Sequence, residues 1–225
     1  MTPPPVIVAI DGPSGAGKST VAKLLASRLG VPYIDTGAMY RAVGLAAREA
    51  DIRLPITDPD GVSRLAESLA IGLETGPEPR VLVNGRDVTA SIREPEISRY
   101  ASAVSAIPRV RSRLVAEQRR LARERGGVME GRDIGTKVFP GTPHKFFLTA
   151  SLPVRAQRRA AELASRGTPQ PYEQVLTEME ARDRDDRTRR ESPLMHDESY
   201  VVVDSGGKDA AAVASEIERR VRGSG

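Results

Sequence analysis

Short apolar runs alternate with stretches of helical spacing along most of the chain. Five runs have the apolar character of buried parallel strands, at residues 6–10, 31–34, 127–130, 145–148 and 200–203. Apolar spacing and end signals predict helices from residue 18 to a stop at Gly30, near residue 94, and over residues 38–50, 109–125, 153–166, 172–190 and 209–222. This alternation predicts an α/β fold with a five-stranded parallel sheet flanked by helices.

A hairpin signal interrupts the alternation in the middle of the chain. Residues 80–83 and 86–88 have the character of short strands, and the Asn84-Gly85 pair between them is a strong turn signal. We therefore predict an inserted small antiparallel β unit over about residues 70–89. Ahead of it, residues 58–61 (DPDG) lack the ligand spacing and the terminal glutamate of a calcium loop, so they are predicted to form a turn.

The composition is that of one domain with a sizeable core. The chain has 225 residues, of which 39% are hydrophobic, so we expect a single domain over residues 1–225. There is no cysteine, which excludes disulfides and cysteine-ligated metals, and the isolated His144 and His196 cannot build a zinc site alone. No apolar stretch reaches the roughly eighteen residues of a membrane span, and the start of the chain lacks the features of a secretory signal. A cytoplasmic protein without membrane contact is therefore expected.

The net charge of +4 favours an anionic partner, either nucleic acid or phosphorylated small molecules. Aromatic residues make up only 4% of the chain, tryptophan is absent, and basic residues are not interleaved with aromatic ones. A stacking platform for single-stranded nucleic acid is thus disfavoured. We expect small phosphorylated ligands and no nucleic acid. No feature of the sequence predicts an oligomer, so a monomer is expected.

A complete phosphate-loop motif follows the first predicted strand. The pattern G-x-x-x-x-G-K-[ST] is matched at residues 12–19, between a strand and a helix start, as this motif requires. Backbone N–H groups of such a loop wrap a phosphate, Lys18 reaches the β- and γ-phosphates, and the Ser19 hydroxyl holds magnesium. The predicted ATP-binding residues are Gly12, Pro13, Ser14, Gly15, Ala16, Gly17, Lys18, Ser19 and Thr20.

Further residues suited to anions follow the second strand. The chain has neither the Asn-Lys-x-Asp element of GTP switches nor adjacent acids at the end of a candidate strand, as in motor ATPases. Thr36 and Gly37 stand at a predicted helix N-terminus, Arg41 is placed to clamp a phosphate, and Tyr40 to stack on a base. A capped helix with a solvated arginine and a packed tyrosine fits the same residues equally well.

Two more groups of charged residues fit a phosphate-transferring site. Arg132 and Asp133 follow the third strand, and ligands of open α/β sheets bind at the carboxyl ends of strands. In the polar helix over residues 172–190, Arg182, Asp186 and Arg189 share one face. A solvated face is the ordinary interpretation of such charges, but an arginine-rich helical lid over about residues 153–192 would stabilise a transferring phosphoryl group. The preceding helix adds Arg155, Arg158 and Arg159.

Several motifs in one order resemble those of bacterial cytidylate kinases over nearly the whole chain. They are IDGPSGAGKST (residues 10–20), DTGAMYR (35–41), VNGRDVT (83–89), ASAVSAIPRVR (101–111), EGRDIGTKVFP (130–140), RDRDDRTRR (182–190) and SPL (192–194). Some relatives have Gly-Thr where this chain has Ser19-Thr20, and serine where it has Thr36. Ser19 gives the fuller phosphate-loop pattern and Thr36 keeps the hydroxyl, so these departures leave the implied activity intact.

The resemblance implies a phosphate-loop kinase that uses ATP and Mg²⁺ to phosphorylate CMP and dCMP, with a monophosphate-binding region over about residues 37–107. It implies catalytic roles for Lys18, Arg132, Arg159 and Arg189. Cytosine would be read by Ser102, Arg111, Arg132 and Asp133, whose hydrogen-bonding groups suit its N4 donor and its two acceptors. The sugar hydroxyls would be held by Arg182 and Asp186, with Arg189 in the same cluster, and the acceptor phosphate by Arg41. Together with Thr36 and Tyr40, these form the expected CMP site.

Two alternatives stay open at this point. A kinase for UMP or another small acceptor would keep the phosphate loop but lack the cytosine-reading residues. A non-catalytic ATP-binding protein that contacts RNA through its arginines would show steep salt dependence of RNA binding and no turnover of CMP.

Overall fold

The computed structural model describes residues 5–74, 79–123 and 125–223. Two segments with sequence predictions lie outside this part of the chain. They are residues 75–78 of the predicted antiparallel insert and residues 1–4, where no secretory signal was expected. Within it, the main sheet has the strand order β2-β6-β1-β7-β8, which confirms the predicted five strands. They are β1 (Ile7–Asp11), β2 (Tyr33–Asp35), β6 (Gly127–Gly131), β7 (His144–Thr149) and β8 (Val201–Asp204).

The chain divides into two compact units. One, which we call the insert unit, comprises Pro32–Gly127 with Met1–Pro5; the other, the phosphate-loop unit, comprises Val6–Val31 and Val128–Gly225. The prediction of one domain over residues 1–225 stays a prediction. No helix among the described residues is long and apolar enough to span a membrane.

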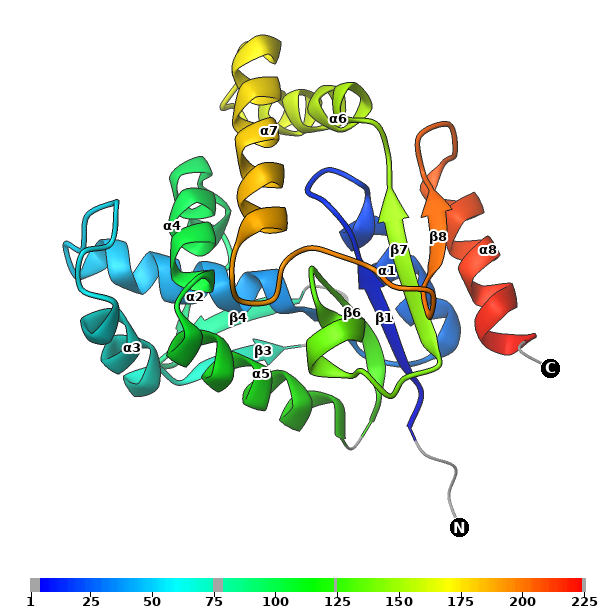
Figure 1. Cartoon of the computed structure of the whole chain (residues 1–225), viewed down its shortest axis with the longest axis horizontal. Helices are drawn as coiled ribbons and strands as arrows, with labels where there is room; N and C mark the ends of the chain where they lie inside the picture. The colour runs from blue at the N-terminus through cyan, green and yellow to red at the C-terminus, as the bar shows by residue number, and fades with distance from the viewer. Residues whose placement is uncertain (1–4, 75–78, 124, 224–225) are drawn as a thin grey trace. The chain divides into compact units, whose positions relative to one another are not determined.

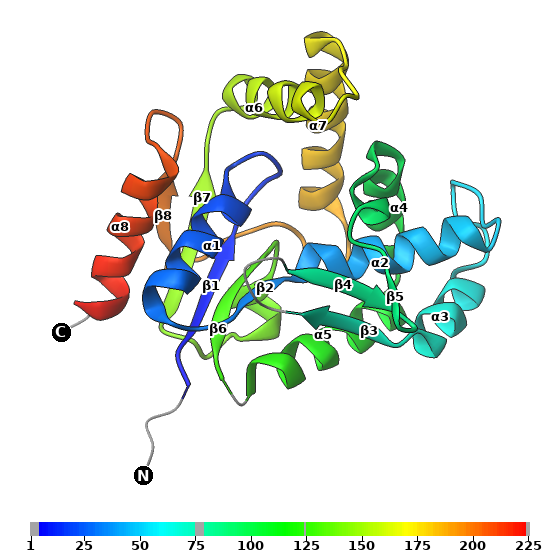
Figure 2. The same cartoon turned by 180° about the vertical axis from the view of Figure 1, so that it is seen from behind.

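In the phosphate-loop unit, the carboxyl ends of neighbouring strands lie at one edge of the sheet. β1 pairs parallel with β7, with Asp11 opposite Phe147, and β7 pairs parallel with β8, with Thr149 opposite Asp204. α1 (Lys18–Leu29) and α8 (Ala210–Arg222) pack side by side along these strands (Figure 2). The loops that leave β1, β7 and β8 therefore meet at one edge, where ligands of parallel sheets bind.

A pair of helices follows β7 in the same unit. α6 (Leu152–Ser165) begins directly beyond the carboxyl end of β7 and packs against α7 (Tyr172–Thr188), as Figure 1 shows. Their contact buries a small apolar cluster of Ala156, Leu163, Val175 and Met179. These two helices occupy the predicted lid region, and the cluster accounts for their fixed mutual packing.

The insert unit contains the predicted antiparallel sheet. β3 (Ile71–Glu74), β4 (Arg80–Val83) and β5 (Arg86–Asp87) pair in that order among the described residues. Asn84 and Gly85 both have positive φ, 50° and 81°, as a two-residue hairpin turn requires. The remaining elements are α2 (Thr36–Glu49), α3 (Pro59–Ser68), the 3₁₀ turn η1 (Ser91–Arg93), α4 (Pro95–Ser105) and α5 (Pro108–Arg123). Figure 2 shows the small sheet of this unit beside α5.

Two local predictions are wrong. Residues 58–61 form the start of α3 instead of a turn, because the Asp58 side chain accepts a hydrogen bond from the Gly61 N–H and Pro59 occupies the first helical turn. The helix predicted from residue 38 begins two residues earlier, at Thr36, because Asp35 caps it by accepting from the Ala38 N–H at 2.9 Å.

Candidate active site

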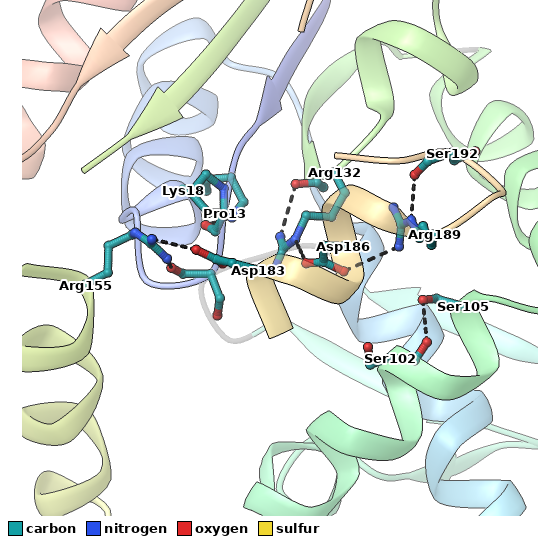
Figure 3. A network of polar contacts seen from close by, with 12 residues as sticks. Pro13, Lys18, Ser102, Ser105, Arg132, Arg155, Asp183, Asp186, Arg189 and Ser192 are labelled. Carbon is teal, nitrogen blue, oxygen red and sulfur yellow. Dashed lines mark hydrogen bonds and ion pairs between the residues drawn. The ribbon is translucent and has the colours of Figure 1, made fainter. Parts of the chain in front are cut away.

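The phosphate loop connects β1 to α1 and is folded as its glycines require. Gly12 has a φ of 147°, and a Cβ at this position would lie 2.0 Å from the Leu148 carbonyl oxygen, so only glycine fits. At the start of α1, the Lys18 ammonium points back and donates to the Pro13 carbonyl oxygen at 2.8 Å (Figure 3). The loop therefore places a lysine and a helix N-terminus at the carboxyl edge of the sheet, an arrangement that binds polyphosphate.

Lys18 is buried among groups that disfavour its charge. Burial lowers the pKa of Lys18 from 10.5 to about 7; the guanidiniums of Arg132 and Arg182 act in the same direction, while Glu130 and Asp11 oppose them. An anion beside the ammonium would reverse this effect, because it stabilises the charged form. The surroundings of Lys18 are thus suited to a negatively charged ligand.

A second cationic cluster centres on Asp186 of α7. Arg132, which follows β6, donates from Nε to Asp186 Oδ2 at 2.8 Å, and Arg189 pairs with Oδ1 at 3.6 Å (Figure 3). Burial raises the pKa of Asp186, but Arg132, Arg182 and Arg189 outweigh it and hold this pKa below its ordinary value. Burial likewise lowers the pKa of Arg132, and the Asp186 carboxylate outweighs that effect and raises it. Three guanidiniums thus gather around this one carboxylate, an arrangement that favours an anionic ligand.

A buried carboxylate fixes the segment that carries Arg132 and Asp133. Asp11, at the end of β1, accepts hydrogen bonds from the N–H groups of Ile134 and Gly135 at 2.9 Å each. These two residues begin the short π-helix η2 (Ile134–Val138), directly after Asp133. The Tyr200 hydroxyl donates a third hydrogen bond to Asp11, at 2.8 Å. Asp11 directly precedes the phosphate loop, so these hydrogen bonds tie the start of that loop to the chain just beyond Asp133.

Substitution Tyr200→Phe is expected to destabilise the fold by about 1–3 kcal/mol, and more at alkaline than at acidic pH. Burial raises the pKa of Asp11 to about 6, and the Tyr200 hydrogen bond is among those that limit the rise. Without this hydrogen bond the pKa of Asp11 in the folded state rises further. The variant therefore loses most unfolding free energy above about pH 6, where Asp11 is ionised, and less where Asp11 is protonated in both proteins. Chemical unfolding at pH 5 and pH 8 measures the difference. An equal loss at both values would contradict the role given to this hydrogen bond.

In the insert unit, the first turns of α2 carry Thr36 and Arg41, two of the predicted residues. Thr36 is buried at the first position of the helix. The Arg41 guanidinium donates to the capping residue Asp35 at 3.0 Å, while about a quarter of its side chain stays exposed. Arg41 is thus held in place without being enclosed, which is compatible with a role in binding a phosphate.

Tyr40, Ser102 and Arg111 are also gathered within the insert unit. The buried Arg111 guanidinium lies 5.4 Å from the Tyr40 ring centroid and donates to the Ser105 carbonyl oxygen at 3.2 Å. The Ser105 hydroxyl in turn donates to the Ser102 carbonyl oxygen at 2.8 Å (Figure 3). Tyr40 is 9% exposed, so the structure fits the packed-tyrosine interpretation. Base stacking by Tyr40 stays a prediction.

The structure separates Arg159 from the clusters around Lys18 and Asp186. Its guanidinium pairs at 2.8 Å with Glu162, one turn further along α6. Sequence reasoning missed Asp11, Tyr200 and Asp183 as parts of this site, and it named Arg155 without identifying its buried partner Asp183. An ionisable residue at the end of an apolar strand was the available signal for Asp11, whereas the others are joined to their partners only by the fold.

Comparison with known proteins places the chain in one family. A family model described as "Cytidylate kinase" matches residues 8–222. Cytidylate kinases of Symbiobacterium thermophilum and Pelotomaculum thermopropionicum are 45% and 48% identical, over 96% of both chains for the first and 95% of both for the second. A crystal structure of an uncharacterized protein from Eubacterium ventriosum aligns over 96% of this chain and 98% of that chain, with a TM-score of 0.54 and 14% identity, which supports the fold alone.

Proposed function

Because the chain belongs to the cytidylate kinase family, we propose that it transfers the γ-phosphoryl group of ATP to CMP and dCMP, giving ADP with CDP or dCDP. The observation that carries this proposal is the closeness of two anion-binding groups in one unit. The guanidiniums of Arg132 and Arg182 lie near enough to Lys18 to lower its pKa. A donor polyphosphate at Lys18 and an acceptor nucleotide held by these guanidiniums would then be neighbours, as direct transfer needs. Such a reaction belongs to pyrimidine nucleotide metabolism in the cytoplasm.

Charge stabilisation and positioning suffice for this chemistry. The acceptor oxygen of CMP already carries negative charge, so no strong general base is required. We propose that Lys18, Arg132 and Arg189 stabilise charge on the transferring group, and that Arg159 joins them when the α6–α7 pair closes over the nucleotides. Closure of that pair would also exclude water and suppress hydrolysis of ATP.

The residues present fit a magnesium ion that arrives with ATP. The described residues include no group of three acids or histidines that could hold a metal alone. Asp11 already accepts three hydrogen bonds, and the exposed Ser19 at the start of α1 offers one hydroxyl oxygen. Mg²⁺ commonly has one or two protein ligands and completes its shell with phosphate oxygens and water. When bound, it would neutralise charge on the phosphates.

For the acceptor nucleotide, we propose that Asp133 and Arg132 read the base and that Arg182 and Asp186 hold the sugar hydroxyls. The family relationship supports these roles, as do the burial of Asp133 and the fixed positions of Arg132 and Asp186. Thr36, Tyr40, Arg41, Ser102 and Arg111 are proposed to complete the set, each from the motif that it matches. We likewise propose that the protein binds small-molecule nucleotides, binds no nucleic acid and is a monomer.

Substitution Asp133→Ala is expected to raise the KM for CMP about 10- to 100-fold while the KM for ATP changes less than about twofold. Loss of one well-placed base contact has this magnitude, and ATP is held elsewhere, at the phosphate loop. Steady-state kinetics with each nucleotide varied in turn provides the measurement. Asp185→Ala, at an exposed position of α7, serves as the control for removal of one carboxylate. Equal losses for both nucleotides would argue against base reading by Asp133.

Formation of ADP from ATP and Mg²⁺ with a panel of acceptors tests the proposed function. The panel comprises CMP, dCMP, UMP, AMP, GMP and shikimate, and turnover is expected with CMP and dCMP. Turnover with another acceptor alone would keep the kinase and discard the cytosine assignment. No turnover with any acceptor would favour a non-catalytic ATP-binding protein.

A further inference from the structure

A buried ion pair joins the two helices of the α6–α7 pair. Arg155, in the first turns of α6, donates from one terminal nitrogen to Asp183 Oδ2 of α7 at 2.6 Å (Figure 3). The two side chains are only 4% and 8% exposed. Asp183 Oδ1 is also buried and has no hydrogen-bond partner among the residues that the structure describes. Arg155 is therefore the hydrogen-bonded cation that compensates the buried charge of this carboxylate.

The same guanidinium also holds the phosphate loop. Its second terminal nitrogen donates to the Ser14 carbonyl oxygen at 3.0 Å, and its Nε donates to the Ala150 carbonyl oxygen at 2.9 Å. A trans peptide unit points its C=O and N–H in opposite directions. Because the Ser14 carbonyl is held toward Arg155, the Gly15 N–H of that peptide unit is aimed away from it. Arg155 thus sets the orientation of one of the N–H groups with which such a loop surrounds a phosphate.

The backbone of the loop lies directly against both helices at Gly15. A Cβ at this position would lie 2.9 Å from the Met179 methyl carbon of α7 and 3.0 Å from the Arg155 Cβ of α6. Gly15 also has a φ of 74°, which favours glycine. The phosphate loop and the helix pair therefore form one packed contact, and a shift of one is resisted by the other.

α7 carries this contact into the guanidinium cluster. Through Arg155, Asp183 holds α7 against the loop. One turn further along α7, Asp186 accepts a hydrogen bond from Arg132, so the same helix is also fixed to the guanidinium cluster. The other arginines of α6 have different partners. Arg158 donates to the backbone and hydroxyl oxygens of Ser205, and Arg159 pairs with Glu162. Of the hydrogen bonds that the structure describes for these three arginines of α6, only those of Arg155 reach both the loop and α7.

We propose that Arg155 and Asp183 are positioning residues that couple occupancy of the phosphate loop to binding of the acceptor nucleotide on α7. This inference rests on the proposed function, because it takes ATP and CMP as the two ligands. A ligand that orders the Gly15 N–H stabilises the Ser14 carbonyl in its contact with Arg155, and through Asp183 the position of α7. Coupling of this kind is reciprocal, so each nucleotide tightens the binding of the other by the same factor.

Calorimetric titration of CMP, with and without a saturating non-hydrolysable ATP analogue and Mg²⁺, tests the proposal. In the unsubstituted protein the analogue should tighten CMP binding by about fivefold or more. In the double variant Arg155→Met/Asp183→Leu this factor should fall to within about twofold of one, while CMP still binds in the absence of the analogue. Replacement of both partners by apolar residues is the change that buried ion pairs tolerate best, so the fold is expected to persist.

Two further variants complete the experiment. Asp183→Asn keeps the shape and an acceptor oxygen but removes the charge. The factor by which the analogue tightens CMP binding should therefore lie between those of the unsubstituted protein and the double variant. This variant replaces the double variant in the test if the latter does not fold. Arg166→Met removes an arginine from a more exposed ion pair with Glu162 at the end of α6 and should keep the original factor.

The possible failures are distinct. An undiminished factor in the double variant or in Asp183→Asn would overturn the proposal, and so would an unsubstituted protein that phosphorylates CMP without any coupling. Absence of both CMP binding and CMP turnover in the unsubstituted protein would overturn the proposed function, and this inference with it.

Discussion

Substitution Lys18→Ala is expected to lower kcat/KM by a factor of at least roughly 10²–10³ without loss of the fold. The ammonium is the cationic group of the phosphate loop, and removal of a single preorganised group that stabilises transition-state charge has an effect of this size. Steady-state assays with ATP, Mg²⁺ and CMP provide the measurement. Lys23→Ala, at an exposed position of the same helix, is the matched control.

Thermal unfolding separates this loss of activity from a loss of structure. Because burial lowers the pKa of Lys18 to about 7, the unfolded state binds the proton more tightly than the folded state between about pH 7 and 10.5. Burial of this amine therefore opposes folding at neutral pH, and the opposition fades as the pH rises towards 10.5. The variant should melt at the same temperature as the unsubstituted protein or higher at pH 7. A folded variant with near-normal turnover would contradict the assignment of Lys18.

Substitution Asp186→Ala is expected to destabilise the protein by about 3–5 kcal/mol and to weaken CMP binding. It removes the carboxylate that Arg132 and Arg189 contact, and it leaves these largely enclosed guanidiniums without that partner. Denaturant unfolding and CMP titration measure the two effects. Asp185→Ala changes the same charge at the adjacent exposed position and should remain within about 0.5 kcal/mol of the unsubstituted protein.

The contribution of Asp186 should also depend on pH in a defined direction. Burial raises its pKa, but the surrounding guanidiniums outweigh this and the folded-state pKa is lowered. Its stabilising contribution is therefore present above the pKa of the unfolded chain, near 3.9, and is lost as the pH falls through the folded-state value. The difference in unfolding free energy between the unsubstituted protein and Asp186→Ala should accordingly be constant from pH 6 to 8 and shrink in acid. A difference that grew on acidification would contradict the ion-pair assignment.

The strands and the phosphate loop could be predicted from the sequence because their signals are local. A buried parallel strand is covered on both faces, so its residues are apolar without interruption, and the predicted boundaries of β1 and β7 are within one residue of those observed. The hairpin of β4 and β5 carries its own turn signal in Asn84-Gly85, and the backbone there has the expected left-handed values.

α3 could not be told from a turn by composition alone. Aspartate, proline and glycine within four residues are typical of turns, but aspartate before proline is also the usual start of a helix. The helical spacing of Val62, Leu65, Ala66 and Leu69 decides the question, since Val62, Ala66 and Leu69 are buried and Leu65 packs against the same core. That spacing was the signal to weigh against the turn residues.

The connections inside the site are long-range and have no signature in the sequence. Asp11 meets Tyr200 across 189 residues of chain, and Arg155 meets Asp183 across 28. The sequence shows an arginine-rich helix but not which arginines are buried and engaged. Only the fold separates Arg155, which is enclosed by three acceptors, from Arg159, which lies against Glu162 at the surface of its own helix.

Competition between CMP and UMP in one reaction tests the central claim most directly. Both nucleotides at equal concentration are incubated with the protein, ATP and Mg²⁺, and the diphosphate products are separated and quantified at low conversion. The account predicts CDP in excess over UDP by about tenfold or more, because uracil presents the opposite hydrogen-bonding pattern at position 4. UDP in equal or greater amount, or ADP formed without either diphosphate, would contradict it.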